Sequence, residues 1–274
     1  MSTANAMTEN EVADAKKVNN ALQALERGDD TTAEALLLDV IQRTPRTYVY
    51  QSEDAGGLVI KFWDRSEFMH YIVWTKDHGA AKPIKWAPSA YPRAYFHLGF
   101  LKVKTEQYAA AIELLDRGSA LEPTNPKFKV EKAMALVQMH RFDEALALYQ
   151  SVNEVGPHVC PDHVARAWRG RGGIYIELGQ LDRAEAAFRE SLKIAPGNEL
   201  AINELVYIAQ LREGGQASPI NLTASSDSSA DKCAICGKPF TQGQLTTING
   251  RSAFVCQSCH RTNTQSKKWW EIWK

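Results

Sequence analysis

The chain has 274 residues, of which 44% are hydrophobic, so it can bury a sizeable core in one large domain or two smaller ones. Its 32 lysine and arginine residues balance 32 aspartate and glutamate residues, which excludes a net field that would draw the whole molecule onto nucleic acid or an anionic membrane. No segment approaches the roughly 18 consecutive apolar residues of a membrane span, and the polar N-terminus lacks the apolar core of a signal peptide. We therefore expect a soluble, cytoplasmic protein whose residues 1–13 form a flexible N-terminus.

A faint helical-hairpin pattern occupies residues 14–47. Small and apolar residues recur three to four positions apart on either side of a glycine, and a proline follows the second helix. These positions are Ala21, Gly28, Ala33, Leu37, Val40 and Pro45. The pattern predicts two amphipathic helices joined by a short turn.

Residues 48–91 are unusually aromatic. They hold nine of the chain's 25 aromatic residues, which is too apolar for a disordered tether. Alternation in residues 48–50 and 58–63, around an Asp-Ala-Gly-Gly turn, predicts a β-hairpin, and Asp64 followed by Glu67 predicts the cap of a short helix. The aromatic residues form either a small core against the neighbouring helices or a recognition element at the mouth of a groove.

The helical-hairpin pattern returns at residues 92–125, 126–159 and 165–198. In the clearest copy, small residues stand where the two helices cross, aromatic residues fill the space beside that contact, and proline ends the second helix. These are Trp168, Gly172, Tyr175, Gly179, Ala184, Phe188 and Pro196. Residues 199–213 predict one more helix, which ends at a pair of glycines.

These residues resemble the tetratricopeptide repeat family, and the resemblance covers about half of the chain. It implies a mostly α fold, namely an α-solenoid that begins with the hairpin at 14–47. A small α+β insertion then occupies 48–91, three repeats occupy 92–198, and 199–213 forms a capping helix. The resemblance also implies a protein that works by binding a protein or peptide partner.

In that family the first helix of each repeat lines a concave groove, and its second position points into the groove. Those positions are basic here, with a further arginine nearby: Arg93, Lys127, Arg166 and Arg169. Such a row favours an acidic peptide or a free carboxylate as partner, unless the charges are solvated or pair with local glutamates. The carboxylate clamp for chaperone tails is not expected, because its lysine and asparagine are replaced at the sixth positions by His97, Glu131 and Gly170.

The C-terminal part reads as a separate module. A composition rich in Gly, Ser, Ala and Asp predicts a flexible linker at 214–231, and residues 232–274 follow it. Two C-x-x-C pairs separated by 19 residues predict a four-cysteine zinc site: Cys233, Cys236, Cys256 and Cys259. Four thiolates saturate zinc, so the metal would be structural and would supply most of the folding free energy of the module. The sequence around the cysteines resembles treble-clef modules, above all the zinc domain of the ClpX unfoldase family, which implies binding of a partner protein.

Three tryptophans crowd into the last six residues beside lysines: Trp269, Trp270 and Trp273. They either pack on the folded modules or form an exposed anchor for a partner or a membrane surface. The leading hypothesis is an adaptor whose repeats hold one partner and whose zinc module contacts another. The alternative is a nucleic-acid-associated regulatory factor that uses the basic zinc module and the tryptophan-rich tail.

Enzymatic activity is not expected. No glycine-rich phosphate loop, HExxH pair or nucleophile elbow is present. His158, Cys160, Asp162 and His163 lie close together before the last repeat, but the sequence shows no group that would orient them for catalysis. We interpret this segment as a polar loop.

Overall fold

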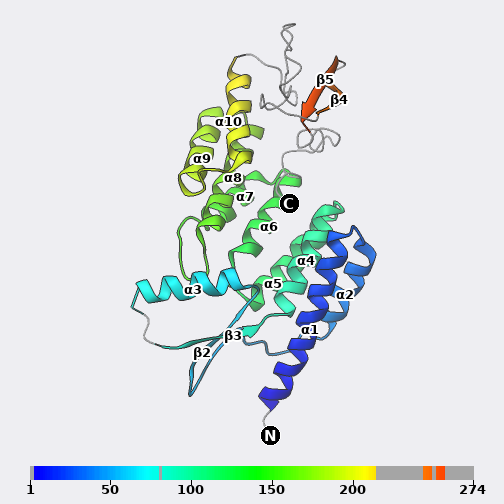
Figure 1. The fold of residues 1–274 in the computed structure, drawn as a ribbon, viewed down its shortest axis with the longest axis vertical. Helices are drawn as coiled ribbons and strands as arrows, with labels where there is room; N and C mark the ends of the chain where they lie inside the picture. Colours follow the sequence, from blue (N-terminus) through cyan, green and yellow to red (C-terminus); the bar gives the residue numbers. More distant parts are fainter. Residues whose placement is uncertain (1–2, 80–81, 214–242, 249–250, 257–274) are drawn as a thin grey trace.

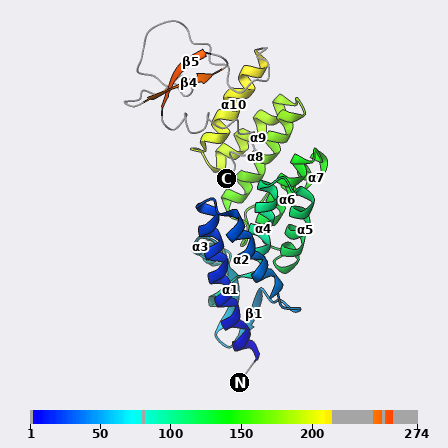
Figure 2. The same ribbon diagram turned by 90° about the vertical axis from the view of Figure 1, so that its right-hand side faces the viewer.

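A computed structural model describes residues 3–79, 82–213, 243–248 and 251–256 of the chain. Helical hairpins stack in sequence order from α1 and α2 to α10, and a small sheet with one helix lies beside the first hairpins (Figure 1). The view at right angles shows the same progression from α1 to α10 (Figure 2). None of the helices in these ranges is both long and apolar enough to cross a membrane.

The first hairpin consists of α1 (Thr3–Glu26) and α2 (Asp30–Gln42), in agreement with the faint pattern at 14–47. α1 already begins at Thr3, within residues 1–13, and the flexibility expected for these residues stays a prediction. Buried Glu11 of α1 accepts a hydrogen bond of 2.6 Å from Lys61 Nζ and one of 3.3 Å from the backbone amide of Ala90. Contacts with the inserted segment therefore hold α1 at Glu11, which precedes the hairpin predicted from residue 14.

The remaining hairpins confirm the helical arrangement expected for 92–213. Their helices are α4 (Tyr91–Lys104), α5 (Tyr108–Leu121), α6 (Pro126–Gln138), α7 (Phe142–Gln150), α8 (Pro161–Glu177), α9 (Leu181–Ile194) and the capping helix α10 (Glu199–Arg212). A Cβ atom on Gly172 would lie 2.7 Å from the ring of Phe188, which is the close helix crossing that the sequence predicts.

The turn inside each of four hairpins uses one residue in the left-handed conformation. Gly28 and Gly179 occupy two of these turns, whereas Glu106 and His140 adopt φ values of 61° and 56° in the other two. Their spacing shows where the repeat length changes: 34 residues separate Glu106 from His140, but 39 separate His140 from Gly179. The extra residues lengthen the α7–α8 loop.

The inserted segment forms a three-stranded sheet and one helix. Its elements are β1 (Gln51–Asp54), β2 (Gly57–Phe62), α3 (Arg65–Asp77) and β3 (Ile84–Pro88). The antiparallel β1–β2 hairpin confirms the prediction, but its first strand starts at Gln51 instead of Tyr48. Tyr48 packs edge-on against Tyr91 within the core of the first hairpin, which removes it from the sheet. The third strand, parallel to β2, was not predicted.

The cap of α3 is the one expected from sequence. The Glu67 amide donates to Asp64 Oδ1 over 3.0 Å, and Glu67 Oε2 accepts from the Trp63 amide over 2.8 Å. These two bonds satisfy backbone donors at the start of the helix. They also fix Trp63, Asp64 and Glu67 as one rigid group.

Near the C-terminus the structure describes an antiparallel pair, β4 (Gly243–Ile248) and β5 (Arg251–Cys256). Cys256 ends β5. The linker at 214–231, the other three predicted zinc ligands and the three tail tryptophans lie outside the described residues: Cys233, Cys236, Cys259, Trp269, Trp270 and Trp273. The structural zinc ion therefore stays a prediction.

Candidate protein-binding groove

The first helices of successive repeats, α4, α6 and α8, carry the four predicted groove residues. Arg93 on α4 is buried; its Nη2 donates to Asn19 Oδ1 of α1 over 2.7 Å, and its Nη1 lies 3.4 Å from the Ser89 carbonyl oxygen. Burial lowers the pKa of this guanidinium, and the nearby carboxylates, Glu67 foremost, oppose that shift. Arg93 thus serves contacts within the chain.

Lys127 on α6 is also engaged within the chain. Its Nζ donates to Glu67 Oε1 over 2.5 Å, lies 3.7 Å from Asp64 Oδ2, and sits 4.7 Å from the centroid of the Trp63 ring. The ammonium group therefore has two carboxylates and an aromatic face as partners, all from the inserted segment. Lys127 therefore fits the alternative in which the basic residues of the row pair with local glutamates.

The two arginines on α8 differ from this pattern. Arg166 Nη2 makes one long contact of 3.4 Å with Glu131 Oε2, and its buried Nε finds no hydrogen-bond partner among the described residues. Arg169 donates to Ser191 Oγ over 3.1 Å, and burial followed by the positive charge of Arg166 lowers its pKa. The two guanidinium groups thus reinforce each other's positive potential at this end of the row.

The basic row is consequently divided into two sections, which we call the closed section and the arginine section. The closed section comprises Arg93 and Lys127 with the inserted residues that cover them. The arginine section comprises Arg166 and Arg169 on α8. All four residues lie on first helices, and their role in a groove stays a prediction. The sequence did not show that the inserted segment supplies the partners of Lys127.

Trp63 anchors the inserted segment in the closed section. Its ring packs edge-on against Phe96 of α4 and Phe128 of α6, with ring centroids 5.1 and 5.6 Å away. Its Nε1 donates to Glu122 Oε2 over 2.7 Å. Neither Trp63 nor Glu122 was a candidate from sequence; the density of aromatic residues was the only signal pointing to this contact.

Glu122, at the end of α5, is the buried acceptor of this interface. Besides the Trp63 indole, it accepts bonds from Ser89 Oγ (2.8 Å) and Asn125 Nδ2 (3.2 Å). Burial raises the pKa of this carboxyl to about 7, although the three donors act in the opposite direction. The group can therefore change charge near neutral pH while it links the insertion to two repeats.

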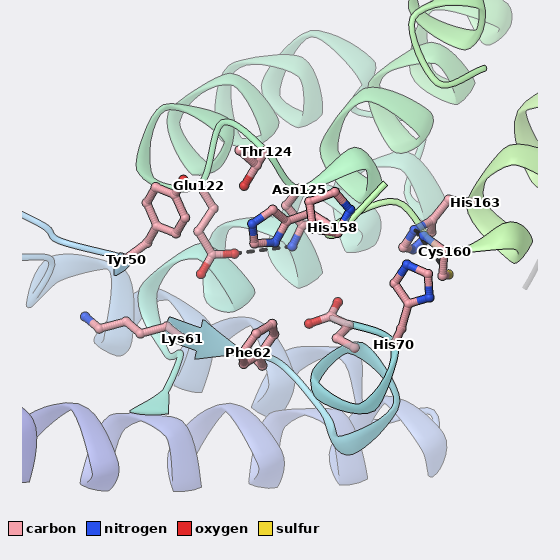
Figure 3. A pocket seen from close by; sticks show the side chains of 12 residues that line it. Tyr50, Lys61, Phe62, His70, Glu122, Thr124, Asn125, His158, Cys160 and His163 are labelled. Carbon is pink, nitrogen blue, oxygen red and sulfur yellow. Dashed lines mark hydrogen bonds between the residues drawn. The ribbon is translucent and has the colours of Figure 1, made fainter. Parts of the chain in front are cut away.

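A small pocket lies where the insertion meets the α5–α6 turn and the α7–α8 loop (Figure 3). It is lined by Tyr50, Lys61, Phe62, Glu67, His70, Glu122, Thr124, Asn125, Pro157, His158, Cys160 and His163. His70 Nε2 lies 2.8 Å from the Gly156 carbonyl oxygen, and the His158 ring packs 5.0 Å from that of Tyr71. The lengthened α7–α8 loop is thus the second attachment of the insertion.

Three residues of the polar loop predicted from sequence line this pocket, namely His158, Cys160 and His163, but the thiol is not activated. Cys160 Sγ lies 3.3 Å from His163 Nδ1. Burial raises the pKa of the thiol and lowers that of the imidazole to about 4, so both groups are neutral at pH 7. A thiolate nucleophile needs the opposite shifts. Within the described ranges, no group of three or more histidine, cysteine or acidic residues has an arrangement that could hold a metal ion.

Comparison with known proteins agrees with this architecture. Models of the tetratricopeptide repeat match residues 92–125 and 130–199. The chain therefore contains tetratricopeptide repeats over this region, as its glycine, aromatic and proline spacing predicted. The first hairpin and the insertion lie outside the matched residues.

Individual relatives are distant. Small glutamine-rich tetratricopeptide repeat-containing protein 2 of Mycosarcoma maydis is 24% identical over 129 residues, 47% of this chain and 32% of that protein. A tetratricopeptide protein of Thermus thermophilus, TTC0263, is 16% identical with a TM-score of 0.48, covering 74% of this chain and 84% of that one. The second tetratricopeptide domain of human RPAP3, solved with the HSP70 peptide SGPTIEEVD, is 24% identical with a TM-score of 0.34, covering 52% and 98%. The chain spans between about an eighth and a third of the length of the curated relatives it matches.

Proposed function

We propose that this protein is a cytoplasmic, non-enzymatic adaptor whose repeats bind an acidic segment of a partner protein. The observation that carries the proposal is the arginine section. The Arg166 side chain is 30% exposed, makes one long contact of 3.4 Å with Glu131 Oε2, and lies close enough to Arg169 to lower the pKa of that residue. A carboxylate placed there would satisfy guanidinium donors and reduce the repulsion between two like charges.

The C-terminal module extends the proposal. A zinc ion held by the four cysteines would fold a second, tethered contact module, and the linker at 214–231 would set its effective concentration beside the repeats. One chain would thus bring two partners together. The matches to tetratricopeptide repeat models over residues 92–125 and 130–199 support the class of function.

The test is a pull-down from extract, with and without nuclease treatment, using the intact protein, the Arg166→Glu variant and the Arg189→Glu variant. Arg189 is the matched control, because it is an exposed arginine on α9 that pairs with Glu185 outside the groove. We expect Arg166→Glu to lose the partner by at least about tenfold while Arg189→Glu retains it, since charge reversal replaces attraction with repulsion. Equal capture by all three proteins would refute the arginine section as the binding site, and loss of capture on nuclease treatment would favour the nucleic-acid alternative.

A further inference from the structure

The insertion has its own core, separate from the cores of the repeats. Its buried cluster consists of Ile60, Phe62 and Tyr71, with Leu58, Phe68 and Ile84 packed against them. Trp63 instead enters a small cluster with Leu115 and Phe128 of the repeats. In the closed section the insertion is therefore held by one aromatic anchor instead of a continuous hydrophobic seam.

The polar contacts beside this anchor have a simple pattern. Within five consecutive residues, an aromatic side chain is followed directly by one carboxylate and, three residues later, by another: Trp63, Asp64 and Glu67. The aromatic ring lies between Phe96 and Phe128, and both carboxylates face Lys127. An incoming peptide with the same pattern would find an aromatic site and a cation already built.

The interface also contains features that are costly in a permanent core. Glu122 is buried and bonded to Trp63 Nε1, and the half-buried His97 on α4 lies among rings and cations, where desolvation lowers its pKa to about 3. A pocket remains between the insertion and the repeats (Figure 3). Buried ionisable groups and incomplete packing both reduce the free energy that holds two surfaces together.

We propose that residues 63–67 occupy the closed section as an internal ligand, and that a partner segment with an aromatic side chain followed by carboxylates competes for the same place. This rests on the proposed function, because it assumes that the concave row is the binding surface. It adds the chemistry of a second recognition site: an aromatic pocket formed by Phe96 and Phe128, beside the ammonium group of Lys127. The insertion then regulates access to half of the groove.

The probe is a fluorescein-labelled peptide of residues 58–71 of this chain, and binding to the full-length protein is followed by fluorescence anisotropy. In the wild-type protein the internal copy occupies the site, so we expect weak binding. In Trp63→Ala the anchor is missing, and the affinity for the peptide should rise by at least about tenfold. Trp86→Ala is the matched control, because Trp86 is an exposed tryptophan of the same insertion whose Nε1 donates to the Phe62 carbonyl.

Two further variants control for nonspecific peptide binding and for a failure of Trp63→Ala to fold. Adding Lys127→Glu to Trp63→Ala should abolish the gain, because it removes the cation that the peptide carboxylates need. Glu67→Gln removes only the ion pair with Lys127 and should give a smaller gain in a protein with a wild-type circular dichroism spectrum, which covers the case that Trp63→Ala fails to fold. Equal peptide affinity of the wild type, Trp63→Ala and Glu67→Gln would overturn the proposal, as would a gain that survives Lys127→Glu.

The two proposals fail in different ways. If Trp63→Ala gains peptide affinity while no captured partner depends on Arg166, the internal ligand stands and the adaptor proposal based on the arginine section falls. If an Arg166-dependent partner is captured while the peptide binds the wild type and the variants alike, the adaptor stands and the internal ligand falls.

Discussion

Glu122 gives the sharpest test of the closed section, because glutamine has nearly the same shape but no charge. The carboxyl has its pKa raised from 4.5 to about 7, chiefly by burial. The folded protein therefore binds this proton more tightly than the unfolded chain does, and the resulting stability is fully present below pH 4.5 and is lost as the pH rises through about 7. At about 1.4 kcal/mol for each pKa unit, the loss amounts to about 3 kcal/mol.

Glu122→Gln removes this dependence. The glutamine oxygen can accept from the Trp63 indole and from Asn125, and its amide can donate to the Ser89 hydroxyl, so the hydrogen bonds survive. In urea unfolding at pH 5, 6.5 and 8, the free energy of unfolding of the variant relative to the wild type should rise with pH by about 2–3 kcal/mol. Histidines titrate equally in both proteins and cancel. A difference that is constant across this pH range would refute the raised pKa of Glu122.

Three other predictions concern the histidines around the inserted segment, the close packing at Gly170 and the predicted zinc site. Burial lowers the pKa of His97 to about 3 and those of His158 and His163 to about 4, from 6.5 in the unfolded chain. The stability of Glu122→Gln should therefore fall as the pH drops from 7 to 4, which thermal melts would measure. An unchanged melting temperature would contradict this. Gly170→Ala should destabilise the protein by about 2 kcal/mol in the same urea titration, because the added Cβ would overlap the Tyr149 ring. Gly156→Ala is the control and should cost far less, because a Cβ added there would have no neighbouring atom within 4 Å. Metal analysis of the purified protein should find one zinc ion for each chain, and Cys233→Ser should abolish stoichiometric zinc; a metal-free wild type would refute the treble-clef prediction.

The helical hairpins could be predicted because the information that specifies them is local. Each needs only apolar residues at helical spacing, a turn and a stop signal within roughly 34 residues. The close approach of Gly172 to Phe188 joins two helices of the same repeat, so the local sequence pattern is enough to predict it. The capping helix followed from the same pattern, and so did the Asp64–Glu67 cap of α3, whose bonds span three or four residues.

The closed section could not be predicted, because its contacts join distant parts of the chain. Lys127 pairs with Glu67, 60 residues earlier, and Trp63 reaches Glu122, 59 residues later. The position of Lys127 in the repeat places it on a first helix, but the neighbouring sequence does not show which carboxylate pairs with it. The same reason applies to Glu11 of α1, whose partners Lys61 and Ala90 lie far away in the sequence.

Chain connectivity explains why one aromatic anchor and one ion-paired lysine can hold residues 63–67 in the closed section. Both of its ends join helices of the stack, α2 and α4, so its effective concentration at the closed section is on the order of millimolar or higher. A free peptide with the same intrinsic affinity and a micromolar concentration would therefore fail to displace it. A partner needs additional contacts to compete, and the arginine section lies on the next first helix of the same row. A segment long enough to reach from Lys127 to Arg166 would gain from both sections, so selectivity for such a partner would arise from the division of the groove itself.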